Sequence, residues 1–286
     1  MGKVRKKKIP LTSILPPTPS SSSRPESSRK VIRQFHVLLK QQAKLETMEH
    51  DPNTVQHLAD IQAQMESLGG LEFYQRMSAI GQGNDRGGGS EKVAISWFKE
   101  VYHSNDASSQ LMLKSGCLPV AMLEVGALKP DNYASCRSWI KNTPLDLHSR
   151  HPDILEQDFL LMDEPDNHER WDIISLSLVL NFVSNAKDRG RMLRLAWSFL
   201  RFGGYLFLAL PLPCVTNSRY LSCETLSALM DAVQFSLVKE RCKTGGKMIY
   251  HLYQKRSQTE GPVDTEPFTK KKVLRQGDRN NFCILL

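Results

Sequence analysis

Three acidic residues follow or end short apolar runs at intervals typical of nucleoside-binding proteins. Glu124 precedes Gly126 by two residues, Asp146 lies twenty residues after this glycine, and Asp158 lies twelve residues farther on. A glycine at such a turn lets the backbone approach a ligand, because it has no Cβ. A carboxylate at the position of Asp146 can accept hydrogen bonds from both hydroxyl groups of a ribose.

This pattern favours binding of S-adenosylmethionine. Glu124 would act on the cofactor's ammonium group, directly or through water, and Asp158 would accept from the adenine amino group while Phe159 lies against the ring. The glycine-rich turn common in methyltransferases is reduced here to Gly126 followed by residues 127–130 (Ala-Leu-Lys-Pro), so the loop must take another shape. Each acid could instead cap a helix or form a turn.

The elements that would position these residues alternate between short apolar runs and helical stretches. Strands separated by helices predict a parallel sheet with crossover connections, and a closing antiparallel hairpin around Gly245 is typical of methyltransferases. We therefore predict an α/β fold, the seven-stranded class I methyltransferase (Rossmann-like) sheet. The expected strands span 120–125, 145–147, 154–159, 172–178, 205–210, 235–241 and 248–254, with helices over 188–202, ended by Gly203–Gly204, and 222–233.

The chain divides into four predicted parts. Residues 1–30 form a disordered basic and Pro/Ser-rich tail, because this composition cannot bury enough apolar surface to fold. Residues 31–115 form a helical extension, with a helical hairpin over 33–68 and a helix over 91–102. Residues 116–256 are the cofactor-binding domain, and residues 257–286 are a basic C-terminal tail.

Composition narrows the class of partner. The formal net charge is +8, and many of the basic residues lie in Lys3–Lys8 and Lys270–Arg279. Such basic segments favour nucleic-acid binding or serve as a nuclear address, and the alternative is that they are merely solvated chain ends. The six cysteines form no C-x-x-C pair and have no histidine at zinc spacing, so we expect reduced thiols and no metal. No apolar run approaches the roughly 20 residues of a membrane span, and we expect no membrane partner.

Six blocks of sequence closely resemble one family, the fungal 25S ribosomal RNA adenine-N1 methyltransferases, which are related to a metazoan S-adenosylmethionine sensor of nutrient signalling. The resemblance covers roughly residues 30 to 255. It implies that Gly126 and Asp146 bind the cofactor, that large-subunit rRNA is the substrate within the pre-ribosome, with or without assembly factors, and that the protein is nuclear and nucleolar. The blocks are Phe73–Ser78, Leu123–Leu128, Glu156–Phe159, Trp171–Val183, Arg189–Leu193 and Leu210–Tyr220.

Two segments can serve the substrate side. Asn181 follows the fourth expected strand, where many base-amino methyltransferases carry a polar residue followed by prolines, which are missing here. Pro211, Leu212 and Pro213 follow the fifth strand, and their carbonyls, uncommitted to a helix, could accept from the adenine N6. Asn217, Arg219 and Tyr220 would then hold a base or phosphate. Alternatively, Asn181 caps a helix and the prolines end a strand.

Two cysteines allow other chemistry. Cys214 could attack C6 of cytosine, as in 5-methylcytosine formation, although cysteine is often simply buried. Residues 283–286 (Cys-Ile-Leu-Leu) fit the C-a-a-X form of prenylation, and an apolar end that packs on the domain explains them equally well.

The sequence favours one function and leaves one alternative open. The first is an S-adenosylmethionine-dependent methyltransferase acting on N1 of an adenine in large-subunit rRNA. The alternative is a non-catalytic S-adenosylmethionine sensor that regulates a protein partner, which the single-glycine loop at Gly126 and the added helical hairpin would suit.

Overall fold

The computed structural model describes residues 25–46, 52–81, 89–102, 119–149, 151–243, 245–256 and 264–286. The basic patch at Lys3–Lys8 and most of the glycine-rich stretch before residue 90 lie outside the described residues. Within the described part of the chain, no helix has the length and apolar character needed to cross a membrane.

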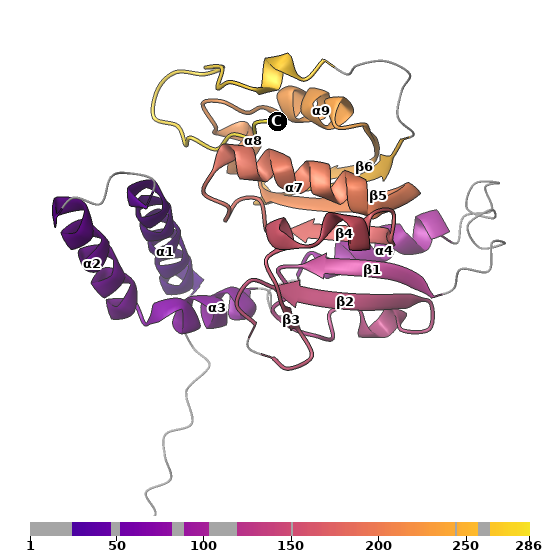
Figure 1. Cartoon of the computed structure of the whole chain (residues 1–286), viewed down its shortest axis with the longest axis horizontal. Helices are drawn as coiled ribbons and strands as arrows, with labels where there is room; N and C mark the ends of the chain where they lie inside the picture. Colours follow the sequence, from indigo (N-terminus) through magenta and orange to yellow (C-terminus); the bar gives the residue numbers. More distant parts are fainter. Residues whose placement is uncertain are drawn as a thin grey trace, which may run out of the picture.

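A seven-stranded sheet forms the centre of the molecule (Figure 1). The strand order is β3-β2-β1-β4-β5-β7-β6, and β7 runs antiparallel to both of its neighbours. This order and the closing hairpin confirm the predicted class I methyltransferase sheet. The strands are β1 (Val120–Val125), β2 (Ile140–Asp146), β3 (Leu155–Glu156), β4 (Trp171–Ser177), β5 (Leu200–Pro211), β6 (Phe235–Cys242) and β7 (Met248–Lys255).

Both faces of the sheet are covered by helices (Figure 1). Helix α4 (Glu91–Tyr102), predicted over the same residues, packs on one face, where it meets Met122 of β1. Helices α7 (Ala186–Phe199) and α9 (Cys223–Ala232) cover the other face, where Leu123 of β1 is fully buried. The alternation of side chains along a strand thus supplies two separate cores.

The structure corrects several predicted boundaries. Strand β2 begins at Ile140, earlier than predicted, because its polar middle residues conceal the strand pattern. Strand β3 is shorter than predicted and is followed by a 3-10 turn, η3 (Phe159–Leu161). Helix α1 begins at Pro25, inside the predicted N-terminal tail.

The prediction that Gly203 and Gly204 end a helix is wrong, because both residues lie inside β5. Gly203 has φ +74°, and a Cβ on Gly204 would come within 2.9 Å of the carbonyl oxygens of Arg201 and Asp172. The pairing of β4 with β5 shifts register here, between Trp171 and Ile173. The glycines therefore allow a bulge in a paired strand, which a residue with a side chain would obstruct.

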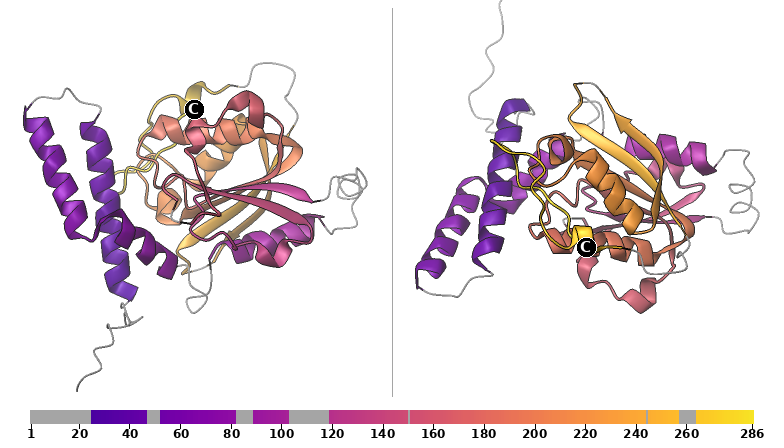
Figure 2. Two further views of the ribbon diagram at one scale, coloured as in Figure 1. Left: turned by 60° about the horizontal axis from the view of Figure 1, so that its bottom comes forward. Right: turned by 90° about the horizontal axis from the view of Figure 1, so that it is seen from above.

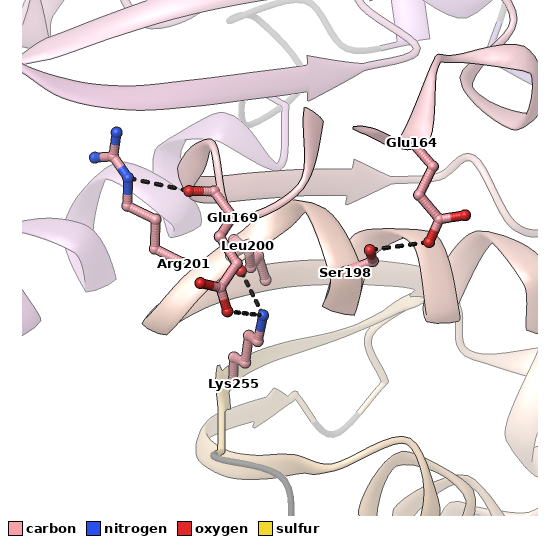
Figure 3. A network of polar contacts seen from close by, with 6 residues as sticks. All are labelled: Glu164, Glu169, Ser198, Leu200, Arg201 and Lys255. Atoms are coloured by element: carbon pink, nitrogen blue, oxygen red, sulfur yellow. Dashed lines mark hydrogen bonds and ion pairs between the residues drawn. The ribbon is translucent and has the colours of Figure 1, made fainter. Parts of the chain in front are cut away.

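Polar contacts fix the connection from α7 to β5 (Figure 3). The buried Lys255 ammonium donates to Glu169 Oε1 at 3.1 Å and to the Leu200 carbonyl at 2.7 Å, and Arg201 Nε donates to the Glu169 carbonyl at 3.3 Å. The Lys255 ammonium also lies 4.2 Å from the Trp197 ring centroid. This network pins the last strand to the end of α7 and leaves the carboxyl ends of the parallel strands free of it.

The N-terminal helices form a separate small cluster beside the sheet. Helices α1 (Pro25–Leu45) and α2 (Pro52–Ser67) make the predicted hairpin, and α3 (Gly70–Gly81) connects the pair to the main domain (Figure 1). The rings of Phe35 and Tyr74 stack with centroids 4.7 Å apart, and Phe182 meets Tyr74 edge-on at 6.0 Å. The extension is thereby attached to the loop that follows β4.

The described part of the predicted C-terminal tail, residues 264–286, packs on the domain, and we call it the C-terminal strap. It includes a 3-10 turn, η4 (Glu266–Phe268). The side chains of Phe282, Cys283, Ile284 and Leu285 are buried. Of the two readings of the Cys-Ile-Leu-Leu end, the structure supports an apolar end packed on the domain.

Arg189 and Gly190 of α7 form the docking site for this end. The buried Arg189 guanidinium donates to the carbonyls of Cys283, Val183 and Ser184, and it lies 4.4 Å from the Phe282 ring centroid. The Leu285 backbone crosses α7 so closely that a Cβ on Gly190 would lie 1.8 Å from the Leu285 carbonyl oxygen. Arg189 therefore joins the end of the chain to the loop after β4.

Gly190→Ala should displace the end of the strap, because the added methyl group occupies the place of the Leu285 carbonyl. We expect a loss of about 2 kcal/mol in the free energy of unfolding, typical of overpacking, although alanine in a helix otherwise stabilises by roughly 1 kcal/mol relative to glycine. Thermal unfolding and limited proteolysis at the C-terminus would measure the effect, with the exposed Arg191→Ala as the control. A Gly190→Ala protein as stable as the wild type would show that this end does not dock on α7.

Candidate cofactor and substrate site

The first turn of the site follows β1. Parallel pairing sets Val125 beside Leu145 of β2 and Leu176 of β4, so three strands end at one edge. The backbone N–H groups of Gly126 and Ala127 both donate to the Leu145 carbonyl, at 2.8 and 3.0 Å. Gly126 has φ +75°, and a Cβ there would lie 2.8 Å from Val179 Cγ2. Glycine is required both for this conformation and for the close approach of the loop after β4.

Glu124 shapes the loop that lacks further glycines. Its buried carboxylate accepts hydrogen bonds from Asn132 Nδ2 at 2.6 Å and from Asn142 Nδ2 at 2.7 Å. One amide belongs to the loop after Gly126 and the other to β2, so the carboxylate ties the loop to the neighbouring strand.

The pKa of Glu124 is raised to about 7. Burial is the main cause, since it disfavours the charged carboxylate, and the two amide hydrogen bonds oppose it. The carboxylates of Glu91 and Asp131 raise the pKa further. A carboxyl group whose pKa is near neutral pH ionises readily when a cation approaches.

Asp146 lines a cavity of about 240 Å³ at the carboxyl end of β2. Its Oδ1 accepts from the His148 backbone N–H at 3.0 Å, and burial raises the pKa of its carboxyl group. A carboxylate in such a recess can receive the two hydroxyls of a ribose. The other lining residues are Gln75, Arg76, Ala127, Leu128, His148, His151 and Ile154.

Helix α3 supplies the wall of this cavity that sequence reasoning missed. Gln75 Nε2 donates to the His148 carbonyl at 3.0 Å and so fastens α3 to the turn after β2. Arg76, which is exposed, also lines the cavity, and a guanidinium can bind a carboxylate through paired hydrogen bonds. The block Phe73–Ser78 carried part of the family resemblance, and this was the available signal for a functional role.

Asp158 and Phe159 lie after β3, at the same edge of the sheet. Asp158 Oδ1 accepts from the Leu160 N–H at 2.8 Å and caps η3, which is the helix-cap role left open by the sequence. The buried Phe159 ring packs edge-on against Phe199, with centroids 5.6 Å apart. Neither residue is among those that line the cavity.

Asn181 lies in the loop after β4, and Val179 of the same loop approaches the Gly126 turn. This loop begins with Leu178, which has φ +60° and donates its N–H to the Ala209 carbonyl at 2.9 Å. The Asn181 side chain is 7% exposed, and its Oδ1 has no hydrogen-bond partner among the described residues. A buried acceptor without a partner is costly, which is typical of a site that a ligand completes.

The prediction that the carbonyls after β5 are uncommitted is wrong for Leu212 and Pro213. Pro211 ends β5, and Pro213 begins a short helix, α8 (Pro213–Thr216), because its fixed φ suits the first helical position. The Leu212 carbonyl accepts from the N–H groups of Val215 and Thr216, and the Pro213 carbonyl accepts from Asn280 Nδ2 at 2.7 Å.

Asn217 and Arg219, predicted to hold a base or phosphate, contact the C-terminal strap. Asn217 Oδ1 accepts from Arg279 Nη1 at 3.3 Å, and Arg219 Nη1 donates to Asn281 Oδ1 at 2.8 Å. Cys214, considered as a nucleophile, is 8% exposed and belongs to the core. The described residues contain no group of three or more histidine, cysteine or acidic side chains suited to a metal ion.

The sheet order, the antiparallel β7 and a recess at the strand ends lined by Asp146 define a class I S-adenosylmethionine-dependent methyltransferase. The chain belongs to the 25S rRNA (adenine(2142)-N(1))-methyltransferase family, Bmt2, whose model matches residues 59–284. The predicted family, the enzymatic activity and the cofactor are confirmed. The family decides for the enzyme over the non-catalytic sensor.

Two relatives match nearly the whole chain. The 25S rRNA adenine-N(1) methyltransferase of Schizosaccharomyces pombe is 33% identical, over 90% of this chain and 91% of its own. The 25S rRNA (adenine(2142)-N(1))-methyltransferase of Saccharomyces cerevisiae is 32% identical, over 93% of this chain and 74% of its own. Among solved structures, 1,6-didemethyltoxoflavin-N1-methyltransferase of Burkholderia thailandensis matches with a TM-score of 0.41 and 16% identity, over 59% of this chain and 84% of that chain.

Cofactor affinity should rise with pH through the pKa of Glu124, which is about 7 in the free protein. If the cationic amino-acid end of the cofactor binds near this carboxylate, binding favours the charged form and releases a proton. Affinity should then be about tenfold weaker one pH unit below this pKa than above it. Calorimetric titration with S-adenosylhomocysteine across this pH range measures the effect.

Glu124→Gln is the matched variant, since it keeps the shape of the side chain and cannot titrate. Its cofactor affinity should lack the step near pH 7. A wild-type profile that is flat across this range, or a step that persists in Glu124→Gln, would contradict a role for this carboxylate in cofactor binding.

Proposed function

We propose that this protein methylates N1 of an adenine in 25S rRNA at the edge between the Gly126 turn and the loop after β4. The observation that supports this placement is Asn181, a buried side chain whose acceptor oxygen has no partner among the described residues and which lies in the same loop as Val179, the residue that approaches Gly126. Family membership supplies the reaction and the substrate class.

The residues around the cavity would hold the cofactor. Asp146 would accept from the ribose hydroxyls, and the backbone at Gly126 would lie against the ligand without a Cβ between them. Arg76 would bind the carboxylate of the cofactor's amino-acid end, and Glu124 would stabilise its ammonium, directly or through water. Asp158 and Phe159 would serve the adenine end through atoms not used in the cap of η3. S-adenosylmethionine supplies the methyl group when bound.

The transfer needs alignment more than acid–base catalysis. Adenine N1 has an in-plane lone pair, which forms the new N–C bond while the bond from the methyl carbon to sulfur breaks and sulfur keeps the electron pair. The base acquires the positive charge that the sulfonium loses. The protein therefore has to place the two reactants in line.

Asn181 would orient the target base. N1 takes part in Watson–Crick pairing, so the adenine must be unpaired or flipped to reach the site. In that state the exocyclic N6 protons need an acceptor, and Asn181 Oδ1 is available for this. Pro213, Asn217 and Arg219 would support the substrate side indirectly, because their side chains or carbonyls contact the strap. Pro211 would do so from the end of β5, where it pairs with Met248.

We further propose that the protein acts on pre-ribosomal particles in the nucleolus, where assembly factors would give access to the rRNA. The basic patch at Lys3–Lys8 would serve as the nuclear address. Imaging of a fluorescent fusion should show nucleolar signal, which should spread to the cytoplasm when these lysines are replaced by glutamine. A wild-type fusion excluded from the nucleus would contradict the proposed location.

Nucleoside mass spectrometry of large-subunit rRNA tests the function directly. A strain that lacks the protein should lose N1-methyladenosine at one site, and purified protein with labelled S-adenosylmethionine should restore it on that rRNA. Unchanged N1-methyladenosine in the deletion strain would refute the proposal.

Asn181→Ala should lower kcat by about 100-fold, a loss typical of removing one positioned hydrogen-bonding group from a catalytic site. Cofactor affinity should stay unchanged, because the side chain serves the base. Asn181→Asp keeps an acceptor oxygen and should retain more activity than the alanine variant. Single-turnover methylation measures both variants, with the exposed Asn53→Ala on α2 as a control. Full activity of Asn181→Ala would exclude this residue from the site.

A further inference from the structure

The C-terminal strap carries a basic stretch, Lys270–Arg279, that is held on the surface of the domain. It contains five basic residues and one acidic residue, Asp278. The side chains of Lys270, Lys271 and Lys272 are exposed, and the next residues, Val273 and Leu274, are 50% and 38% exposed. Charge and apolar surface are thus presented together.

Backbone contacts give this stretch a defined path. The Leu274 N–H donates to the Arg219 carbonyl at 2.8 Å, and Arg275 Nη1 donates to the carbonyls of Val215, Ser218 and Leu221 at 2.9 to 3.2 Å. The Arg275 guanidinium thus holds the strap on the domain, whereas the side chains of the three lysines are exposed. Charges that are already ordered bind a partner at a lower entropic cost than charges on a free tail.

The strap lies near the carboxyl end of β5. It runs over α8, which follows the carboxyl end of β5, and on the same side of the sheet as α1–α3 (Figures 1 and 2). Its Asn280 pairs with Ser218, and the Ser218 hydroxyl donates to the Phe282 carbonyl at 2.5 Å. The basic stretch and the helical extension therefore flank the ends of the parallel strands.

The burial of residues 282–285 indicates whether this basic surface would face a membrane or a polyanion in solution. A basic stretch before a C-a-a-X end could serve a lipid anchor on an acidic membrane. Here Cys283 and Ile284 are 3% and 2% exposed, and the Cys283 carbonyl is held by Arg189. A thiol in this position is inaccessible for prenylation, so the lysines are left to bind a polyanion in solution.

We propose that Lys270–Lys272 on the C-terminal strap form a docking surface for the phosphate backbone of the substrate RNA. This inference rests on the proposed function and assigns it an RNA-binding surface outside the catalytic cavity. The strap binds RNA next to the methylation site, and its buried end ties it to Arg189, which also holds the loop that carries Asn181.

The test is a variant in which Lys270, Lys271 and Lys272 are all replaced by glutamine. For single-stranded RNA, each phosphate contact contributes about 0.7 to the slope of log Kd against log salt. The loss of the three lysine contacts should therefore lower this slope by about 2. RNA affinity at low salt should fall by about tenfold or more. KM for the rRNA fragment should rise, while kcat and S-adenosylhomocysteine affinity stay at the wild-type values.

The matched control replaces three exposed lysines elsewhere, Lys92, Lys99 and Lys141, by glutamine, with the same change in net charge. Equal effects of the two triple variants on RNA affinity and slope would overturn the proposal. It would also be overturned if the strap variant kept its RNA affinity and lost binding to phosphatidylserine vesicles instead. If the strap variant loses RNA affinity but the wild-type protein methylates no rRNA, the docking surface stands and the proposed function fails.

Gly190→Ala provides a second test through the anchor. Release of the buried end should lower RNA affinity without removing any charge. A Gly190→Ala protein whose strap is released, as judged by proteolysis, but whose RNA affinity and salt slope match the wild type would also overturn the proposal.

Discussion

The parallel pairing of β1 with β2 and β4 is the constraint on which the site depends. It brings three strand ends to one edge, so that Gly126, Asp146 and the loop carrying Asn181 meet although they are far apart in sequence. The contact between Gly126 and Val179 shows how closely these turns approach, since it leaves no room for a Cβ. The buried Glu124 carboxylate then fixes the loop after β1 by bonding both sides of it.

Both ends of the described chain reach this edge. From the N-terminal side, α3 attaches through Gln75 and contributes Arg76 to the cavity. From the C-terminal side, the strap attaches through Arg189, which also holds the carbonyls of Val183 and Ser184 in the loop after β4. The methyltransferase sheet supplies the Gly126 turn, whereas α3 adds a wall to the cavity and the strap adds a basic surface to the domain.

Local sequence signals predicted the elements whose residues obey one periodicity. Helix α4 was predicted over its full length, and the spacing of Glu124, Asp146 and Asp158 pointed to residues that the structure places at or after the ends of β1, β2 and β3. The predicted start of strand β2 lies after its actual start, because Lys141 and Asn142 interrupt the apolar pattern of the strand. The roles of Gln75 and Arg189 depend on contacts across 73 and 94 residues, which periodicity does not report. For the same reason, the basic composition near residue 270 suggested a free tail, whereas distant carbonyls hold it in place.

The central claim is that the recess lined by Asp146 and closed by α3 is the cofactor site. A crystal structure of the protein with S-adenosylhomocysteine tests it most directly. The account predicts that the ribose hydroxyls lie within about 3 Å of the Asp146 carboxylate, a normal hydrogen-bond distance, and that the amino-acid end points toward Gly126 and Arg76. A ligand bound at another face of the sheet, with Asp146 left on the His148 N–H alone, would contradict it.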